Sequence, residues 1–294
     1  MIGRAARSEH VSGWLFTLPA AILIGVFGLL PIAWAALLSL QQNDLLTTPT
    51  YVGAENYRTL WHDPVFRASV HRTIVYTLLF VPLSVGGALA LALLLNARIR
   101  LSWFYRTAIF IPVATSTVAT GVIFNWLLEP TYGVANYLLG EVGLGPYGFF
   151  QDPDQALYSI VAMTVWGWLG FDVIVYMAAL QGVPQDLIEA ARLDGAGRWA
   201  TFRHVVLPLL SPATLFLIVW STINALQVFD EIYVTTRGGP LQSTTVLVYY
   251  IYDQAFQFFH GGYAAAIAEV LFAITLVFSL LQLWLGNRRV HYSS

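Results

Sequence analysis

The sequence predicts an all-α, polytopic membrane protein, and three observations lead to this prediction. Of the 294 residues, 57% are hydrophobic and only 10% are charged, whereas an ordinary soluble domain carries about 25% charged residues. The apolar residues gather in six runs, and each run exceeds the roughly 20 residues that cross a hydrocarbon core as a helix. No run has the roughly ten-residue alternation of a membrane β-barrel, and lipid offers no partner for open backbone groups, so we expect helices.

The six expected helices follow one another in a single transmembrane domain, residues 1–294. Proline is expected to bend the first helix at Pro19 and Pro31. Glu129-Pro130 is expected to end the third helix, because proline disfavours helical geometry in the residue before it. The expected helices cover residues 13–40, 70–96, 107–128, 156–181, 209–232 and 263–285.

The distribution of basic residues predicts the orientation of these helices. All fourteen basic residues are arginines. With the amino terminus in the cytoplasm, ten arginines lie on the inner side and four on the outer side, which satisfies the positive-inside rule. We therefore expect both termini and the loop 182–208 in the cytoplasm. The inner set is Arg4, Arg7, Arg98, Arg100, Arg106, Arg192, Arg198, Arg203, Arg288 and Arg289, and the outer set is Arg58, Arg67, Arg72 and Arg237.

Composition also excludes several functions. The net charge of −2 gives no reason to expect a nucleic-acid partner. Without cysteine the chain has no thiolate metal site and no disulfide, and we expect no metal site. A phosphate-binding loop of the Gly-x-x-x-x-Gly-Lys-Ser/Thr type needs a lysine, which the chain lacks. We therefore expect no catalytic residue.

The loop 182–208 is too long for a simple turn. Residues 185–192 favour a short helix, glycines interrupt it, a second short helix is expected over 198–204, and Pro208 leads back into the membrane. The first helix offers Leu187, Ala190 and Ala191 as a small apolar surface beside charged residues. Such a surface suits docking into a groove on a cytoplasmic partner. An amphipathic loop that lies on lipid headgroups is the alternative.

The motif in this loop resembles a known family. Glu189-Ala190-Ala191, then Gly195, then Val205-Val206-Leu207-Pro208 is similar to the EAA loop of ABC importer permeases, with valine at 205 in place of the usual isoleucine. Further segments resemble the maltose-type carbohydrate permeases and their glycerol-phosphate branch, so that the resemblance extends from about residue 14 to 285. These segments include Phe124-Asn125-Trp126-Leu127-Leu128, Trp166 to Asp172, Phe229-Asp230-Glu231-Ile232-Tyr233, Gly238-Gly239-Pro240 and Gly262-Tyr263-Ala264.

The resemblance implies a type I permease fold and a division of labour. The chain would be a multi-pass permease of a bacterial or archaeal cytoplasmic membrane, embedded in lipid and non-catalytic itself. Its partners would be a second homologous permease subunit, two ATPase subunits that bind ATP and Mg²⁺, and an extracytoplasmic solute-binding protein. Alternating access would be driven through the loop, and the chain itself would need no cofactor. The residues expected to couple to the ATPase are Glu189, Ala190, Ala191, Asp194, Gly195, Leu207 and Pro208.

Polar residues within the spans are candidates for the solute pathway. Asn224, Gln227 and Glu231 recur at spacings of three and four in the fifth span, with Ser221 one turn earlier, and Asp172 lies in the fourth. Amide and hydroxyl groups suit a sugar, and aromatic rings for its apolar faces could come from Phe124, Trp126 and Phe229. Hydrogen bonds between helices are the alternative role for these residues. A neutral sugar is preferred, because all fourteen arginines lie at or beyond the expected span ends.

A second class of function remains open from the residues. In a gradient-driven secondary carrier, Asp172 and Glu269 would be the ion-coupling groups, because ionisable side chains within a membrane are costly and often functional.

Overall fold

The computed structural model describes residues 14, 16–44, 47–96 and 102–287, apart from the side chains of residues 102 and 287. Of the arginines expected on the inner side, Arg4, Arg7, Arg98, Arg100, Arg288 and Arg289 lie outside the described residues. The chain divides into two compact units, Met1–Asp63 with Ile251–Phe272 and Pro64–Tyr250 with Ala273–Ser294.

The first unit begins with an apolar helix, Phe16–Ser39. Side-chain hydrogen bonds stabilise the end of this helix. The Asn56 amide donates hydrogen bonds to the carbonyl oxygens of Ser39 and Gln41, at 2.7 and 2.9 Å. The hydroxyls of Ser39 and Tyr57 lie 2.7 Å apart. These bonds hold the short helix that contains Asn56 and Tyr57 against the end of the first helix. The elements of this part are η1 (Gly25–Leu29), α2 (Leu30–Ser39), the antiparallel pair β1 (Gln41–Gln42) and β2 (Thr50–Tyr51), and α3 (Glu55–His62).

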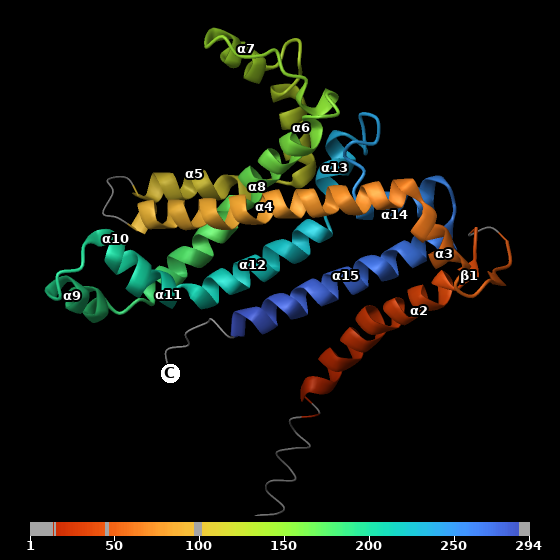
Figure 1. Cartoon of the computed structure of the whole chain (residues 1–294), viewed down its shortest axis with the longest axis horizontal. Coiled ribbons are helices and arrows are strands. Elements are labelled where there is room, and N and C mark those ends of the chain that lie inside the picture. Colours follow the sequence, from red (N-terminus) through yellow and green to blue (C-terminus); the bar gives the residue numbers. More distant parts are fainter. Residues whose placement is uncertain (1–13, 15, 45–46, 97–101, 288–294) are drawn as a thin grey trace, which may run out of the picture. The chain divides into compact units, whose positions relative to one another are not determined.

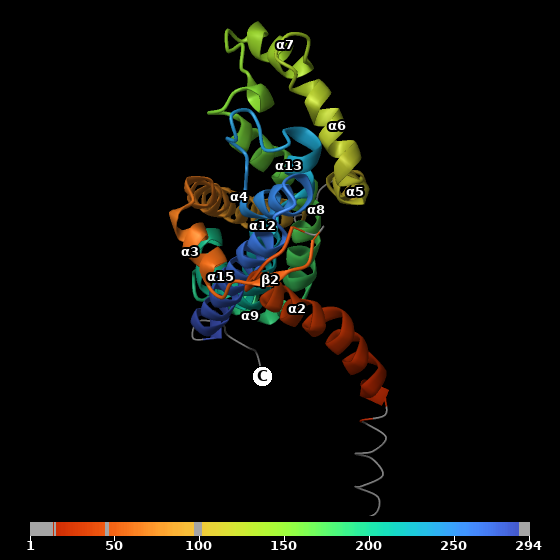
Figure 2. The same cartoon turned by 90° about the vertical axis from the view of Figure 1, so that its right-hand side faces the viewer.

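The core of the second unit is formed by α4 (Pro64–Asn96), α8 (Ala156–Gln181) and α12 (Ser211–Leu226). In Figure 1, α8 crosses behind α4 and α12 lies along α4, and Figure 2 gives the view turned by 90°. Ala88 and Ala92 of α4 are fully buried, and small residues at a spacing of four let two membrane helices approach closely. The larger core side chains fill the space on either side. They are Val85, Leu95, Val173, Tyr176, Leu180, Leu210 and Leu217.

Shorter elements surround this core. Those of the second unit are α5 (Ser102–Ala114), α6 (Thr117–Leu127), α7 (Val134–Glu141), η2 (Phe149–Gln151), α9 (Gln185–Leu193), α10 (Arg198–Thr201), η3 (Phe202–Val206), α11 (Leu207–Leu209) and α13 (Asp230–Thr235). The elements α14 (Leu247–Tyr252), η4 (Asp253–Gln257) and α15 (Gly261–Asn287) carry the chain from the second unit through the first and back.

Two of the expected spans are broken helices. The expected helix 107–128 is the pair α5 and α6, which meet at a bend of 103°. Ser116 has extended geometry, with φ −61° and ψ 135°, and therefore interrupts the helix four residues after Pro112. The expected helix 209–232 differs at both ends. A bend of 64° precedes Ser211. At the other end, α12 stops at Leu226, where its C-cap residue Gln227 leaves helical geometry, with φ −104° and ψ 14°.

The described residues contain four helices that are long and apolar enough to cross a membrane, or six if each bent pair forms one span. The mostly helical, multi-span fold class is therefore confirmed, with six spans when the bent pairs are counted in this way. The cytoplasmic placement of the termini stays a prediction.

Candidate functional site

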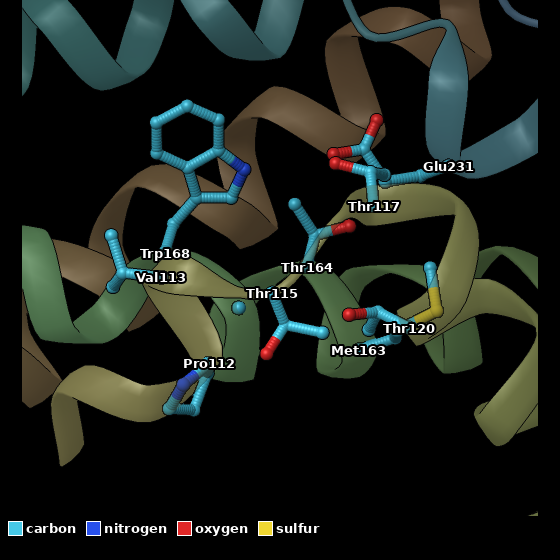
Figure 3. Close-up of a pocket in the computed structure, with 10 residues that line it drawn as sticks. Pro112, Val113, Thr115, Thr117, Thr120, Met163, Thr164, Trp168 and Glu231 are labelled. Atoms are coloured by element: carbon cyan, nitrogen blue, oxygen red, sulfur yellow. The ribbon is translucent and has the colours of Figure 1, made fainter.

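A polar cavity lies at the bend between α5 and α6, where α8 and α13 face it (Figure 3). It adjoins a second cavity that reaches the end of α12, and the two share Thr117, Thr164, Trp168 and Glu231. Their volumes are about 80 and 150 Å³. This space lies at the helix break at Ser116. A continuous helix could not make the turn from α5 to α6 that leaves the space beside α8. The remaining lining residues are Pro112, Val113, Thr115, Thr120, Met163 and Gly167 in the first cavity, and Tyr76, Phe80, Asn224, Ala225, Gln227, Val228, Phe229 and Asp230 in the second.

An indole and a carboxylate dominate the shared part of the two cavities. The indole nitrogen of Trp168 is directed toward the Glu231 carboxylate, and the two side chains hydrogen-bond (Figure 3). The Thr164 hydroxyl donates to the carbonyl oxygen of Ile160, at 2.9 Å, and its side chain also meets the buried Tyr76. The site therefore offers an aromatic surface beside a hydrogen-bonding carboxylate.

Two of the expected pathway residues, Asn224 and Gln227, line the second cavity. The Asn224 amide nitrogen donates to the carbonyl oxygen of Trp220, at 2.8 Å, which leaves its second N–H and its amide oxygen for a ligand. Gln227 is the C-cap residue of α12 and is exposed. The end of α12 thus places two amide groups on the cavity wall.

The structure places Ser221 and Asp172 elsewhere. Ser221 is 3% exposed and Asp172 is 1% exposed, and neither is among the residues that line the two cavities. Asp172 instead accepts a hydrogen bond from the Ser84 hydroxyl of α4, at 2.5 Å. The environment of Asp172 therefore matches the alternative role considered for the polar residues of the spans, which is a hydrogen bond between neighbouring helices.

Of the three aromatic residues expected to contact a sugar, one lines one of the two cavities described above and the other two do not. Phe229 lines the second cavity. Phe124 packs against the Trp166 ring, with centroids 5.3 Å apart, and Trp126 is exposed. Sequence reasoning missed the cavity residues Trp168, Thr117 and Thr164. The signals that could have indicated them were Pro112 and the hydroxyl-rich run that follows it, which together suggest a polar break in a membrane helix.

The loop expected over 182–208 contains the two short helices α9 and α10. A Schellman motif ends α9: the Gly195 amide donates to the Arg192 carbonyl at 3.0 Å, and the Ala196 amide donates to the Ala191 carbonyl at 2.9 Å. Gly195 has φ +84°. Only glycine adopts this conformation without steric cost, so the sharp exit from α9 depends on it.

The side chains of this loop form a largely exposed surface. Glu189, Ala190, Asp194 and Gly195 are exposed, whereas Ala191 is half-buried. Leu193 is 90% exposed. Trp199 of α10 is 70% exposed and packs on Phe202, with ring centroids 5.4 Å apart. Leu207 is at the margin of exposure and Pro208 is half-buried, where α11 starts toward the next span. Large apolar side chains left in the open at a helix turn suit a protein partner.

Within the part of the chain that the structure describes, no group of three or more His, Cys, Asp or Glu side chains could hold a metal ion.

A bundle of broken membrane helices with a polar cavity and an exposed helical loop defines a transport permease. The chain belongs to the family of binding-protein-dependent transport system inner membrane components, whose model matches residues 84–291. It is therefore a multi-pass membrane permease subunit of an ABC importer. This assignment confirms the importer permease predicted from the loop motif, rather than a gradient-driven carrier.

Individual proteins support the assignment over almost the whole chain. The chain is 38% identical to the lactose transport system permease protein LacF of Rhizobium radiobacter, covering 96% of both chains. It is 32% identical to the sn-glycerol-3-phosphate transport system permease protein UgpA of Pectobacterium atrosepticum, covering 98% of this chain and 99% of UgpA. The crystal structure of a bacterial alginate ABC transporter, in complex with alginate pentasaccharide-bound periplasmic protein, contains a chain with a TM-score of 0.84. It is 24% identical, and the match covers 98% of this chain and 97% of that one. The fold is that of type I ABC importer permeases.

Proposed function

We propose that this chain forms one half of the transport pathway of an ATP-driven importer for a neutral carbohydrate. A second homologous permease subunit supplies the other half. Two ATPase subunits bind ATP and Mg²⁺ and hydrolyse ATP on the cytoplasmic side, and an extracytoplasmic binding protein delivers the solute. The chain itself is non-catalytic and moves the solute by alternating access, with both of its termini in the cytoplasm of a bacterial or archaeal cell.

The residues that line the two cavities are the observation that supports a neutral carbohydrate as the solute. Trp168 and Phe229 offer ring faces, and Asn224, Gln227 and Glu231 offer hydrogen-bonding groups. Sugars present apolar ring faces and hydroxyls to such a surface, and ligand sites commonly combine aromatic walls with a few polar groups. The described lining residues of the two cavities include two acids, Asp230 and Glu231, and no arginine or histidine. An anionic solute would meet repulsion there, so an uncharged one is favoured.

The size of the cavities supports a shared pathway. Pockets for small molecules commonly measure about 300–1,000 Å³, whereas the two cavities measure about 80 and 150 Å³. Neither of these two cavities by itself holds a disaccharide in the described conformation. The second permease subunit would complete the site when the two subunits open a common cavity between them.

The loop around α9 is the proposed contact with the ATPase. The exposed residues Glu189, Ala190 and Leu193 combine a charge, a small side chain and a large apolar one. Gly195 fixes the angle at which α9 meets α10. Ala191, Asp194, Leu207 and Pro208 complete the proposed coupling segment, because they link this surface to the start of α12.

Reconstitution tests the proposal. The chain is purified with its partner permease and ATPase subunits, inserted in vesicles, and supplied with the binding protein and a radiolabelled neutral disaccharide. We expect uptake that requires ATP and the binding protein, and no ATPase activity from this chain alone. Uptake by this chain alone, driven by an ion gradient, would overturn the proposal.

Removal of the negative charge at the cavity tests the solute class. Glu231→Gln should retain neutral-sugar uptake with reduced affinity, whereas sn-glycerol 3-phosphate should not become a substrate. If the unmodified importer transports the phosphate ester and not neutral sugars, the proposed solute class is wrong while the importer function stands.

A further inference from the structure

The face of the second unit between α5 and α8 carries a groove that the proposed transport mechanism does not use. Its volume is about 450 Å³, and it shares no lining residue with the two polar cavities. Its apolar walls come from α5 and α8, and Leu95 near the end of α4 lies at its base. The lining residues are Leu95, Arg106, Thr107, Ile109, Phe110, Gly170, Val173, Ile174, Met177, Ala178 and Gln181.

The groove is closed at one end by helix contact. At Gly170 an added Cβ would lie 2.4 Å from the carbonyl oxygen of Ile109, so α5 and α8 touch there. From this contact the groove extends toward Arg106 at the start of α5 and Gln181 at the end of α8. Leu95 and Val173 are buried at its base. Phe110 and Ile174 are exposed along its rims.

The polar lining residues gather at the open end. The Thr107 hydroxyl donates to the carbonyl oxygen of Trp103, at 2.9 Å, which leaves the Arg106 guanidinium and the Gln181 amide. Arg106 is exposed, and in residues 102–287 and the other described segments it takes part in no ion pair. The groove is therefore amphipathic along its length, with a cationic end and an apolar end.

Aromatic residues indicate where the cationic end lies in the membrane. Trp103, Phe104 and Tyr105 directly precede Arg106, and all three are exposed. Such aromatic clusters mark the membrane–water interface. Arg106 is therefore at the level of lipid headgroups. Ile109, which contacts Gly170 of α8, follows Arg106 by three positions on α5, so the closed end of the groove lies about 5 Å deeper at a rise of roughly 1.5 Å per residue.

We propose that this groove is a binding site for one anionic phospholipid. The phosphate binds the Arg106 guanidinium, which favours phosphate geometrically as well as electrostatically, and Gln181 donates a further hydrogen bond. One acyl chain lies between Phe110 and Ile174 over Leu95 and Val173. The inference does not depend on the transported solute. It gives α8 a lipid contact directly before the chain enters the loop of α9.

Native mass spectrometry of the full chain, purified with its partner subunits and titrated with phosphatidylglycerol, tests the site. We expect Arg106→Gln to weaken the tightest phosphatidylglycerol binding step about tenfold, and Arg106→Lys to weaken it less, because the positive charge remains. Ile174→Trp should displace the lipid by filling the groove. Arg67→Gln, at the opposite end of α4 from Leu95, is the matched control and should bind as the unmodified protein does. Free glycerophosphoglycerol should not compete, because it lacks the acyl chain.

Photocrosslinking identifies the occupant directly. Benzoylphenylalanine at position 174 should crosslink to phospholipid in native membranes. Crosslinking to the second permease subunit would overturn the proposal, because the groove would then be a protein interface. Equal phosphatidylglycerol binding by the unmodified protein, Arg106→Gln and Ile174→Trp would overturn it as well.

Discussion

The hydroxyl of Ser84 donates a 2.5 Å hydrogen bond to Oδ2 of Asp172, and both side chains are almost completely buried between α4 and α8. One turn further along α8, the Tyr176 hydroxyl donates to the Thr214 hydroxyl of α12, at 3.0 Å. A carboxylate buried in a membrane bundle is costly without a partner. These two bonds connect α8 to both neighbouring core helices, and the first of them gives the buried Asp172 carboxylate a hydrogen-bond partner at this depth.

Removing the donor of the first bond should destabilise the bundle. We expect Ser84→Ala to lower the free energy of unfolding by about 2 kcal/mol, because a hydrogen bond to a charged group contributes about 1.5–3 kcal/mol. Thermal unfolding in detergent measures the change. Asp172→Asn keeps an oxygen acceptor and should be milder. Neither variant should alter the KM for solute uptake, and a large KM change with unchanged stability would return Asp172 to the solute pathway.

A side chain at Gly195 should uncouple transport from ATP hydrolysis. The residue has φ +84°, so Gly195→Val strains the Schellman turn and changes the exit of α9. We expect loss of ATPase subunits on size-exclusion chromatography and loss of uptake, with normal membrane insertion. Gly197→Ala is the control, since Gly197 has φ −69° and open space around its Cα. If both variants behave alike, backbone geometry at 195 does not control coupling.

Reversing a charge on the exposed face of α9 should also reduce uptake, because it alters the docking surface for the ATPase and leaves the backbone unchanged. Glu189 is exposed and makes no ion pair among the described residues, so Glu189→Lys leaves the fold intact and reverses the charge offered to a partner. We expect uptake to fall at least tenfold with unchanged thermal stability. Co-purification of the ATPase subunits in normal amount, together with normal uptake, would contradict the proposed docking role.

The Trp168 indole in the cavity wall should contribute to solute affinity. Trp168→Ala removes the ring that borders both cavities, and we expect the KM for neutral-sugar uptake to rise about tenfold, equivalent to about 1.4 kcal/mol. Trp168→Phe retains an apolar ring and should lose less. Uptake kinetics in vesicles at saturating binding protein separate this effect from delivery. An unchanged KM for Trp168→Ala would remove the indole from the solute site.

Close packing at Gly170 should be intolerant of a single methyl group. An added Cβ would meet the Ile109 carbonyl at 2.4 Å and Val113 Cγ2 at 2.8 Å. We expect Gly170→Ala to destabilise the protein by about 2 kcal/mol, as overpacking commonly costs about 1–3 kcal/mol. Gly86→Ala on α4, where an added Cβ meets nothing within 4 Å, is the matched control and should be neutral or slightly stabilising. Equal melting temperatures for the two variants would contradict the contact.

The prolines within the spans show how much of the helix geometry could be predicted from the sequence. The third span contains Pro112, and the helix breaks just after it, with a bend of 103°. Pro82 lies within α4, which nevertheless continues unbroken from Pro64 to Asn96. The first span, in which bends are expected at Pro19 and Pro31, is a single candidate span, Phe16–Ser39, with a π-helical turn before Pro31. A proline removes one backbone donor, but the surrounding packing decides whether the helix bends.

The sequence by itself determined the membrane-spanning fold class and the permease family. Long apolar runs have no other stable arrangement in lipid, and the Glu189 to Pro208 motif is a local pattern that does not depend on distant contacts. Only the tertiary structure decided which polar residues face a cavity. Helical spacing placed Ser221, Asn224 and Gln227 on one face of α12, but it could not tell which part of that face a neighbouring helix covers. Ser221 is buried against the core while the other two line a cavity, because the packing of α4 and α8 against α12 is set by contacts far apart in the chain.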